Sequence, residues 1–294
     1  MTYFVQLLVN AVALGSIYAL TAIGYSMVYG ILELINFAHG SVYMFGAFLF
    51  YIFNQMLQLP WYTAMLLAIV CAGVLGVIYE KLTVLPIRRA GLPKFAGLIC
   101  LTGVSYIITN GMFLAMGSES RLYPTFFAGE TFSVGAITIS YIQILTTGIG
   151  VLILVLLLLL INKTKIGLGM RTIAQNSEAA YLMGISVNDV ISFTFFLGSA
   201  LAAVSGIFAC MTFRSVDISI GNSMAIKAFA ATVLGGIGNL SGAVVGSLII
   251  AAAEVLTAGY ISSDFRDFSS FVILILILLF RPYGLFGKVV QKKV

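Results

Sequence analysis

Long apolar runs separated by short polar stretches dominate this chain, and the runs have the length of membrane-spanning helices. A helix of about 20 apolar residues crosses the hydrocarbon layer of a bilayer. Val151–Ile161 is apolar at every position, whereas the strands of a membrane barrel alternate apolar and polar residues. We therefore predict helices over these segments: Phe4–Tyr29, Ser41–Phe53, Trp61–Leu82, Phe95–Met116, Tyr141–Ile161, Val190–Phe213, Met224–Gly236, Ala243–Tyr260 and Phe268–Phe280.

The segments predict an all-α integral membrane protein with about eight or nine transmembrane helices, some of them interrupted or re-entrant. Met224–Gly236 is short enough to enter and leave the membrane on one side, so the sequence leaves the number open. The polar stretches are too short for a separate soluble domain. We therefore expect a single transmembrane domain over residues 1–294.

Composition strengthens this interpretation, because 61% of the residues are hydrophobic and only 9% are charged. An average soluble domain is about 45–50% apolar and about 25% charged. So few charges cannot cover a water-soluble fold, and any reaction in water must therefore belong to a partner chain. Cys71, Cys100 and Cys210 lie inside apolar runs without paired spacing, which predicts buried thiols rather than disulfides or a metal site.

The basic residues predict the orientation of the chain. They gather in residues 81–94, 163–171 and 281–293, and short loops rich in Lys and Arg face the cytoplasm. The loops around residues 118–140 and 214–222 combine single Arg residues with Glu119, Glu130 and Asp217 and are predicted to face outward. An external N-terminus and a cytoplasmic C-terminus follow, which favours nine crossings. The net charge of +5 does not indicate a nucleic-acid partner.

The first polar interruption, Gly30–Gly40, contains Glu33, Asn36 and the only histidine of the chain, His39. Ionisable groups at membrane depth usually face a cavity or a partner. One interpretation is a broken helix whose freed backbone and polar side chains line a substrate path. The other is a cytoplasmic turn in which Asn36 caps the following helix.

The second interruption, Lys227–Gly242, holds Gly235, Gly236 and Gly238, followed by Asn239. It is not a dinucleotide-binding motif, because the third glycine is missing and no strand precedes it. Lys227 either extends its amine to the interface or belongs to a pathway. Interrupted segments in both halves of a chain favour a transport site where they meet.

The third polar stretch lies between residues 162 and 189 and predicts a short helix outside the membrane. The helix can begin at Thr172 or at Asn176, and Gly184 suits its C-terminal end. Ser186 has capping-box spacing for the next span. The basic residue Arg171 lies beside this helix. The helix is either an amphipathic helix on lipid headgroups or a docking helix for a soluble partner.

Sequence motifs of enzymes are missing from the chain. It contains no G-x-x-x-x-G-K-[ST] phosphate loop and no G-x-S-x-G or H-E-x-x-H motif. A single histidine makes a catalytic metal improbable. We therefore predict a chain that is not an enzyme and has no cofactor or metal of its own.

Several motifs resemble those of the branched-chain amino acid ABC transporter permeases of the LIV type. They are Ala22–Gly30, Ile35–Gly40 (INFAHG), Tyr43–Ala47, the stretch from Lys227 through Leu234–Asn239 (LGGIGN), and Arg281–Gly287. The resemblance implies a bacterial inner-membrane subunit with a second related permease, two cytoplasmic ATPases that bind ATP and Mg, and an extracytoplasmic solute-binding protein.

The same resemblance implies a role for the stretch over residues 163–189. Glu178, Ala179 and Ala180, with Gly184, resemble the EAA loop by which importer permeases engage their ATPases. It therefore favours docking as the function of this helix, with Arg171 beside it.

The substrate is less well defined than the mechanism. The family often has an acidic residue directly after His-Gly, where this chain has Ser41. Since the family also includes permeases for urea and short amides, another small polar solute is an alternative. A different mechanism is an ion-coupled carrier that works alone, with Glu33, His39, Lys227 and Glu254 as intramembrane charges.

Overall fold

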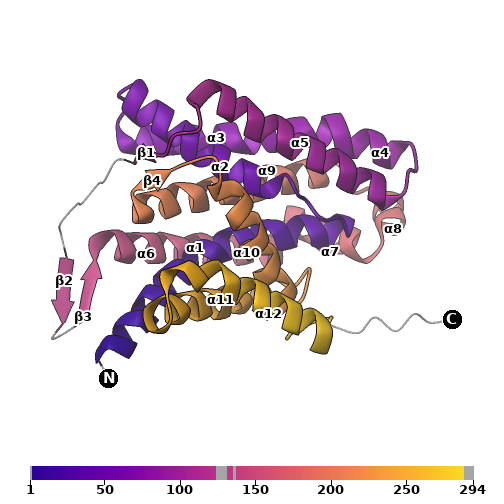
Figure 1. Cartoon of the computed structure of the whole chain (residues 1–294). Coiled ribbons are helices and arrows are strands. Elements are labelled where there is room, and N and C mark those ends of the chain that lie inside the picture. The colour runs from indigo at the N-terminus through magenta and orange to yellow at the C-terminus, as the bar shows by residue number, and fades with distance from the viewer. Residues whose placement is uncertain (1, 124–130, 135–136, 288–294) are drawn as a thin grey trace.

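The computed structural model describes residues 2–123, 131–134 and 137–287, and helices make up most of this part of the chain (Figure 1). Glu130 of the predicted outer loop and Lys288, Lys292 and Lys293 of the predicted basic tail lie outside the described residues. The helices are α1 (Thr2–Leu32), α2 (His39–Tyr51), α3 (Trp61–Tyr79), α4 (Leu85–Arg89), α5 (Lys94–Met116), α6 (Tyr141–Lys163), α7 (Lys165–Gln175), α8 (Ser177–Leu182), α9 (Val187–Phe213), α10 (Ile220–Gly235), α11 (Leu240–Tyr260) and α12 (Arg266–Phe280).

Short irregular elements complete the fold. π-helical turns extend α2 over Ile52–Met56 and join α3 to α4 over Glu80–Val84, and a 3-10 turn covers Ser263–Phe265. β1 (Arg121–Leu122) pairs antiparallel with β4 (Ser215–Val216), and β2 (Thr131–Val134) pairs antiparallel with β3 (Ile137–Ser140).

The predicted fold class is confirmed, because each of the nine predicted segments is a helix with ends within a few residues of the expected ones. Among the described residues, six helices are long and apolar enough to cross a membrane: α1, α3 with its extension to Arg89, α5, α6, α9 and α11. α2, α10 and α12 are shorter, with 13, 16 and 15 residues. Nine crossings therefore stay a prediction.

The core of the bundle is built around α1 and α9. The spanning windows of these two helices are each 78% buried, whereas those of α5 and α6 are each 22% buried. Small residues allow the central helices to approach closely. A side chain at Gly46 would overlap Ala203 of α9, and one at Gly206 would overlap the backbone of Tyr43.

The two ends of the bundle differ in what they carry. Figure 1 shows α4, α7 and α8 at one end, which we call the α8 end, and the N-terminus with β2 and β3 at the other, the N-terminal end. The end of α4 and the start of α9 meet at the α8 end, where Arg88 donates to Asn188 Oδ1 at 3.5 Å. The loop between α4 and α5 and the α8–α9 connection therefore lie at this end. The predicted basic loops thus share one end.

The prediction of buried cysteines is wrong for two of the three. Cys210 is buried in α9, but Cys71 of α3 and Cys100 of α5 lie on the outer surface of the bundle. A thiol behaves as a small apolar group, so an apolar run gives it no preference between the core and a surface that faces lipid.

Candidate functional site

The first predicted interruption is an irregular stretch between α1 and α2. No helix covers residues 33–36, yet Leu34, Asn36 and Ala38 are buried. Asn36 donates from Nδ2 to the Tyr79 hydroxyl at 3.1 Å, and its Oδ1 accepts from the Ala38 amide at 3.2 Å. The break therefore lies inside the bundle rather than in an exposed turn.

Asn36 does not cap α2, contrary to the turn interpretation. The residue that precedes α2 is Ala38, and no side-chain hydrogen bond caps this helix. The Asn36 side chain instead binds the backbone two residues on, which leaves its amide free to reach α3. A polar side chain that bonds to its own nearby backbone is typical of such breaks.

His39 is the first residue of α2 and is buried against the middle of α1. Its Nε2 lies 3.1 Å from the carbonyl oxygen of Thr21; since a carbonyl only accepts, Nε2 is the protonated ring nitrogen. The ring meets Tyr25 edge-on at 5.4 Å between centroids. Gly24 makes room for it, because a Cβ there would lie 2.9 Å from the imidazole Cε1.

Glu33 lies apart from this buried group. It has a left-handed φ of 50°, its side chain is exposed, and it forms an ion pair with Lys94 at the start of α5. The structure therefore places Glu33 at the α8 end of the bundle, beside the predicted basic loop, and not among the intramembrane charges of an ion-coupled carrier.

The second interruption is a glycine turn that joins α10 to α11. Gly236 and Gly238 have φ values of 100° and 83°, which side chains other than glycine rarely adopt. Gly235 packs so closely on Gly242 that a Cβ on either would overlap the other's backbone. Asn239 caps α11, because its Oδ1 accepts from the Gly242 amide at 3.0 Å.

The C-terminal segment of the described chain binds to this glycine turn. The amides of Leu285 and Phe286 donate to the carbonyls of Leu234 and Gly235, at 2.8 and 3.2 Å. Asn239 Nδ2 donates to the Phe286 carbonyl at 3.3 Å. The freed carbonyls at the end of α10 are thus satisfied by backbone amides of the segment that follows α12.

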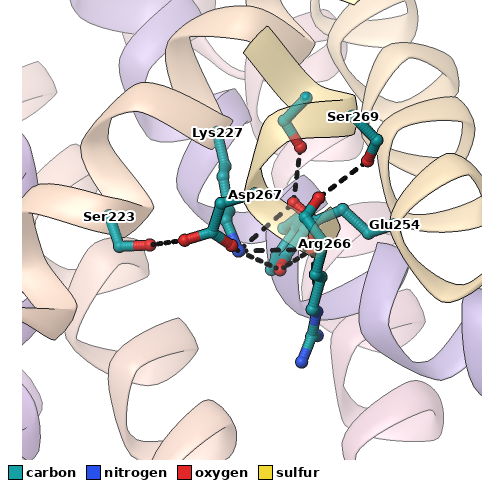
Figure 2. Close-up of polar contacts among 8 residues, drawn as sticks. Ser223, Lys227, Glu254, Arg266, Asp267 and Ser269 are labelled. Carbon is teal, nitrogen blue, oxygen red and sulfur yellow. Dashed lines mark hydrogen bonds and ion pairs between the residues drawn. The ribbon is translucent and has the colours of Figure 1, made fainter. Parts of the chain in front are cut away.

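Lys227 lies in α10 about two turns before the glycine turn and belongs to a separate cluster of four charges. Figure 2 shows Lys227 between Glu254 and Asp267. Its Nζ is 3.2 Å from Glu254 Oε1 and 2.7 Å from Asp267 Oδ1. Arg266 donates from Nε to Glu254 Oε2 at 3.2 Å. Two cations and two anions balance one another, as buried charges require.

Glu254 is the centre of this charge cluster. Its side chain is fully buried and also accepts hydrogen bonds from the Tyr18 hydroxyl at 2.7 Å and the Ser270 hydroxyl at 2.5 Å. The cluster ties α1, α10, α11 and α12 together. Lys227 therefore does not simply extend to an interface, and its ammonium is held inside the bundle.

Sequence reasoning did not find Arg266, Asp267 or Tyr18 as members of this cluster. A signal was present, because Glu254 lies within an apolar run and Arg266-Asp267 directly precedes another. An ionisable residue in such a run needs a partner of opposite charge, and Arg266 is the nearest cation to Glu254 in the sequence.

The third polar stretch forms two helices rather than one. Thr172 lies inside α7, where its hydroxyl donates to the Leu168 carbonyl, so the helix start predicted there is wrong. The alternative start is confirmed, because Asn176 caps α8 by accepting from the amides of Glu178 and Ala179 at 2.9 and 3.0 Å. Thr164 caps α7.

Most side chains of α8 are exposed on the surface of the chain. Glu178 and Ala179 are exposed, Ala180 is buried, and Gly184 ends the segment with a φ of 81°. Next to Gly184, three large side chains have exposed fractions of 74–84%: Tyr181, Leu182 and Met183. Ser186 precedes α9 as predicted but makes no side-chain capping bond.

Two cavities bring predicted site residues together at the α8 end. A cavity of about 480 Å³ has Glu33 and Glu178 in its lining, so it joins the break after α1 to α8. A smaller one of about 100 Å³ is lined by Arg171 and Gly238, which joins α7 to the glycine turn. Lys227, in the other half of α10, lines neither.

Comparison with known proteins gives a consistent result over nearly the whole chain. The family described as "Branched-chain amino acid transport system / permease component" matches residues 7–280. The chain is 37% identical to the high-affinity branched-chain amino acid transport system permease protein BraD of Pseudomonas aeruginosa, over 99% of this chain and 98% of that protein. The corresponding protein LivH of Escherichia coli K12 gives the same identity and coverage.

A solved structure supports the fold alone. PsaBC from Streptococcus pneumoniae in complex with Fab aligns with a TM-score of 0.53 at 15% identity, covering 93% of this chain and 91% of that one.

Proposed function

Because this chain belongs to the family of permease components of branched-chain amino acid transport systems, we propose that it is the membrane-spanning subunit of an ATP-driven ABC importer for leucine, isoleucine and valine. The observation that carries this proposal is the similarity to BraD and LivH over almost the full length of each chain. The subunit contributes the path and no ATPase site.

The proposed assembly places this chain in a bacterial inner membrane with its C-terminus in the cytoplasm. Residues 1–294 form one transmembrane permease domain with a cytoplasmic coupling loop at 163–189. Its partners are a second related permease, two ATP-binding subunits that hold ATP and Mg, and an extracytoplasmic solute-binding protein. This arrangement agrees with basic loops at the α8 end.

In this proposal α8 is the contact with an ATPase subunit, through Glu178, Ala179, Ala180 and Gly184, with Arg171 of α7 beside it. Support comes from Tyr181, Leu182 and Met183, whose large exposed side chains would fit a cleft on a soluble partner. A helix lying on lipid headgroups is the alternative. ATP-driven closure of the ATPase pair would push α8 and rock the spans.

We assign the path or its gate to the two interruptions, Asn36–His39 and Gly235–Asn239. Irregular backbone at membrane depth is tolerated where it is buried in protein or lines a cavity. The 480 Å³ cavity beneath α8 reaches Glu33, and Arg171 shares a crevice with Gly238. Movement of α7 and α8 would therefore act on Glu33, which precedes the first interruption, and on Gly238 within the second. Lys227 would act on the same path from the charge cluster.

Reconstitution tests the proposed function. Proteoliposomes that contain both permeases and both ATPases, supplied with the solute-binding protein, are expected to accumulate radiolabelled leucine only with MgATP inside the vesicles. Uptake by this chain alone under an ion gradient would contradict the proposal. Binding of leucine, isoleucine and valine to the solute-binding protein is expected by calorimetry; binding of urea or amides instead would indicate the alternative substrate.

A further inference from the structure

A cavity of about 630 Å³ lies between α5, α10 and α12, away from the α8 end cavities. α2 and α10 pack against each other and form its floor, while α5 packs beside α2 and α12 beside α10. Figure 1 shows α2 and α10 between α5 and α12. Its volume falls within the range of about 300–1,000 Å³ that is typical of small-molecule sites. We call it the α5–α12 chamber.

One wall of the α5–α12 chamber carries hydroxyl groups. Ser41 Oγ lies 2.5 Å from Ser105 Oγ and 3.1 Å from Thr109 Oγ1, so three hydroxyls from α2 and α5 form a connected set. Each hydroxyl both donates and accepts, so the set can turn toward an ammonium or a carboxylate. Asn222, an exposed residue at the start of α10, adds an amide to the lining.

The opposite side of the chamber is aromatic and aliphatic. Phe229 and Ile226 line it from α10, and Phe271 and Leu274 line it from α12. Phe229 in turn packs against Tyr25 of α1 at 6.0 Å between ring centroids. No charged residue is among the lining residues that the structure describes. An apolar wall facing a few convergent polar groups is the usual design of a small-molecule site.

We propose that the α5–α12 chamber binds the transported amino acid during its passage, an inference that rests on the proposed function. The branched aliphatic side chain lies against Phe229, Phe271 and Leu274, and the charged groups on the α-carbon are solvated by the hydroxyls of Ser41, Ser105 and Thr109. Because no ion pair forms, binding is weak, and a site along a path must release its ligand.

The chamber also adjoins the buried break described above. Phe37 of the break lines it, and Ser41 follows His39 by two residues on α2. A hydroxyl there keeps the chamber uncharged, which suits a ligand whose own two charges cancel.

Thiol labelling tests the proposal in the assembled transporter. In a chain with Cys71, Cys100 and Cys210 replaced by Ala, Thr109→Cys places a thiol of similar size in the chamber. Thr147→Cys is the matched control, because Thr147 is equally half-buried but lines a different groove, between α1 and α6. The rate of alkylation by N-ethylmaleimide is measured with MgATP and either leucine-loaded or leucine-free solute-binding protein.

Leucine is expected to slow alkylation of Thr109→Cys and to leave Thr147→Cys unchanged. At about twice the half-protecting concentration the rate falls about threefold, because two thirds of the sites are then occupied. Ala225→Cys, on the floor of the chamber, repeats the measurement from α10. Full alkylation at either chamber position is expected to block leucine uptake.

Three results would overturn the proposal while leaving the proposed function intact, provided that the unmodified transporter imports leucine. They are alkylation at both chamber positions without leucine protection, normal uptake after full alkylation, and thiols that never react because a partner's side chains or lipid fill the chamber. Failure of the unmodified transporter to import leucine would instead contradict the proposed function.

Discussion

A carboxyl group buried inside a membrane protein needs partners that replace the water it has lost, and Glu254 has several. It receives hydrogen bonds from Tyr18 and Ser270 and faces the cations of Lys227 and Arg266. Asp267 balances the second positive charge. Removal of one member therefore leaves the others with an uncompensated charge, and this makes the cluster testable residue by residue.

Glu254→Gln is expected to destabilise the chain because Lys227 and Arg266 then share only Asp267. Breaking a buried ion pair costs about 3–5 kcal/mol, and we expect the lower end because Asp267 and Arg266 are partly exposed. Thermal unfolding in detergent measures the loss. Glu119→Gln, which removes an exposed acid at the N-terminal end, is the control and should leave the melting temperature unchanged.

The same cluster predicts a partial rescue. Adding Lys227→Met to Glu254→Gln removes the surplus cation and leaves Arg266 with Asp267, so the double variant is expected to melt above the Glu254→Gln single variant. A double variant that is no more stable than the single one would show that charge balance does not explain the cluster.

Tyr79→Phe tests the buried break between α1 and α2. The substitution leaves the Nδ2 donor of Asn36 without its 3.1 Å acceptor, and a buried unsatisfied polar group costs about 1–3 kcal/mol. Thermal unfolding should show a loss of this size, and leucine uptake should fall with it. Tyr62→Phe at an exposed site of α3 is the control. Equal melting temperatures for the two variants would contradict a role for this bond.

At the scale of residues, sequence reasoning identified polar side chains in apolar runs but not their partners. Asn36 and His39 are buried as a broken helix requires, yet Tyr79 and Thr21 are 43 and 18 positions away from them. No periodicity links positions so far apart. Glu33 has the same sequence context as Asn36 but is exposed, and it forms an ion pair with Lys94 instead of a buried contact.

At the scale of elements, α8 is the segment whose role is easiest to separate from stability. Glu178→Arg together with Gly184→Val reverses an exposed charge and places a branched side chain at a left-handed φ of 81°, which costs about 1–2 kcal/mol. No atom lies within 4 Å of the added Cβ. We expect an inserted, folded chain with little ATP-dependent leucine uptake, measured in proteoliposomes with the complete transporter.

A matched pair at the other end of the bundle provides the control for α8. Gly117 has a φ of 80° with no atom within 4 Å of an added Cβ, and Glu119 is exposed nearby. Gly117→Val with Glu119→Arg therefore imposes the same strain and charge change far from α8, and uptake should persist. Normal uptake by the α8 variant, or equal loss in both variants, would contradict coupling through α8.

Apolar runs and the polar stretches between them predicted the long helices well. Each run must be helical because its backbone N–H and C=O groups have no other hydrogen-bond partners in lipid. The elements outside the membrane were predicted less well. α7 was missed because Thr172 and Gln175 have capping-box spacing, whereas Thr164 is the residue that actually accepts from the first turn. Threonine is a favoured cap residue at either position. Thr164 is the cap because α6 ends at Lys163, directly before it.

At the scale of the whole molecule, apolar character does not reveal which helices are central. α6 is the most apolar of the six long helices and one of the two least buried, whereas α1 and α9 are less apolar and the most buried. The reason is that apolar side chains are as stable in contact with lipid as inside the bundle, while close packing between helices favours Gly, Ala, Ser and Thr.

The path of the chain through the membrane is also a property of the whole molecule. With an external N-terminus, the short helix α2 decides on which side the loops of the first half lie. If α2 with its π-helical extension crosses the membrane, the α4–α5 loop lies in the cytoplasm and the α5–β1 loop outside. If α2 did not cross, these two loops would exchange sides, and Glu33 would be separated from its ion-pair partner Lys94. Ala90 and Ser118 are exposed residues of the two loops, so a cysteine at each reports its side directly.

We expect α2 to cross, because basic residues surround Ala90 but not Ser118 and short basic loops stay in the cytoplasm. In the cysteine-free chain, a membrane-impermeant maleimide added to intact cells should label Ser118→Cys and should label Ala90→Cys only after permeabilisation. Labelling of Ala90→Cys in intact cells, with Ser118→Cys protected, would contradict a crossing by α2. That result would put the Lys81–Lys94 basic loop outside and α8 on the same side as the solute-binding protein, where no ATPase could reach it.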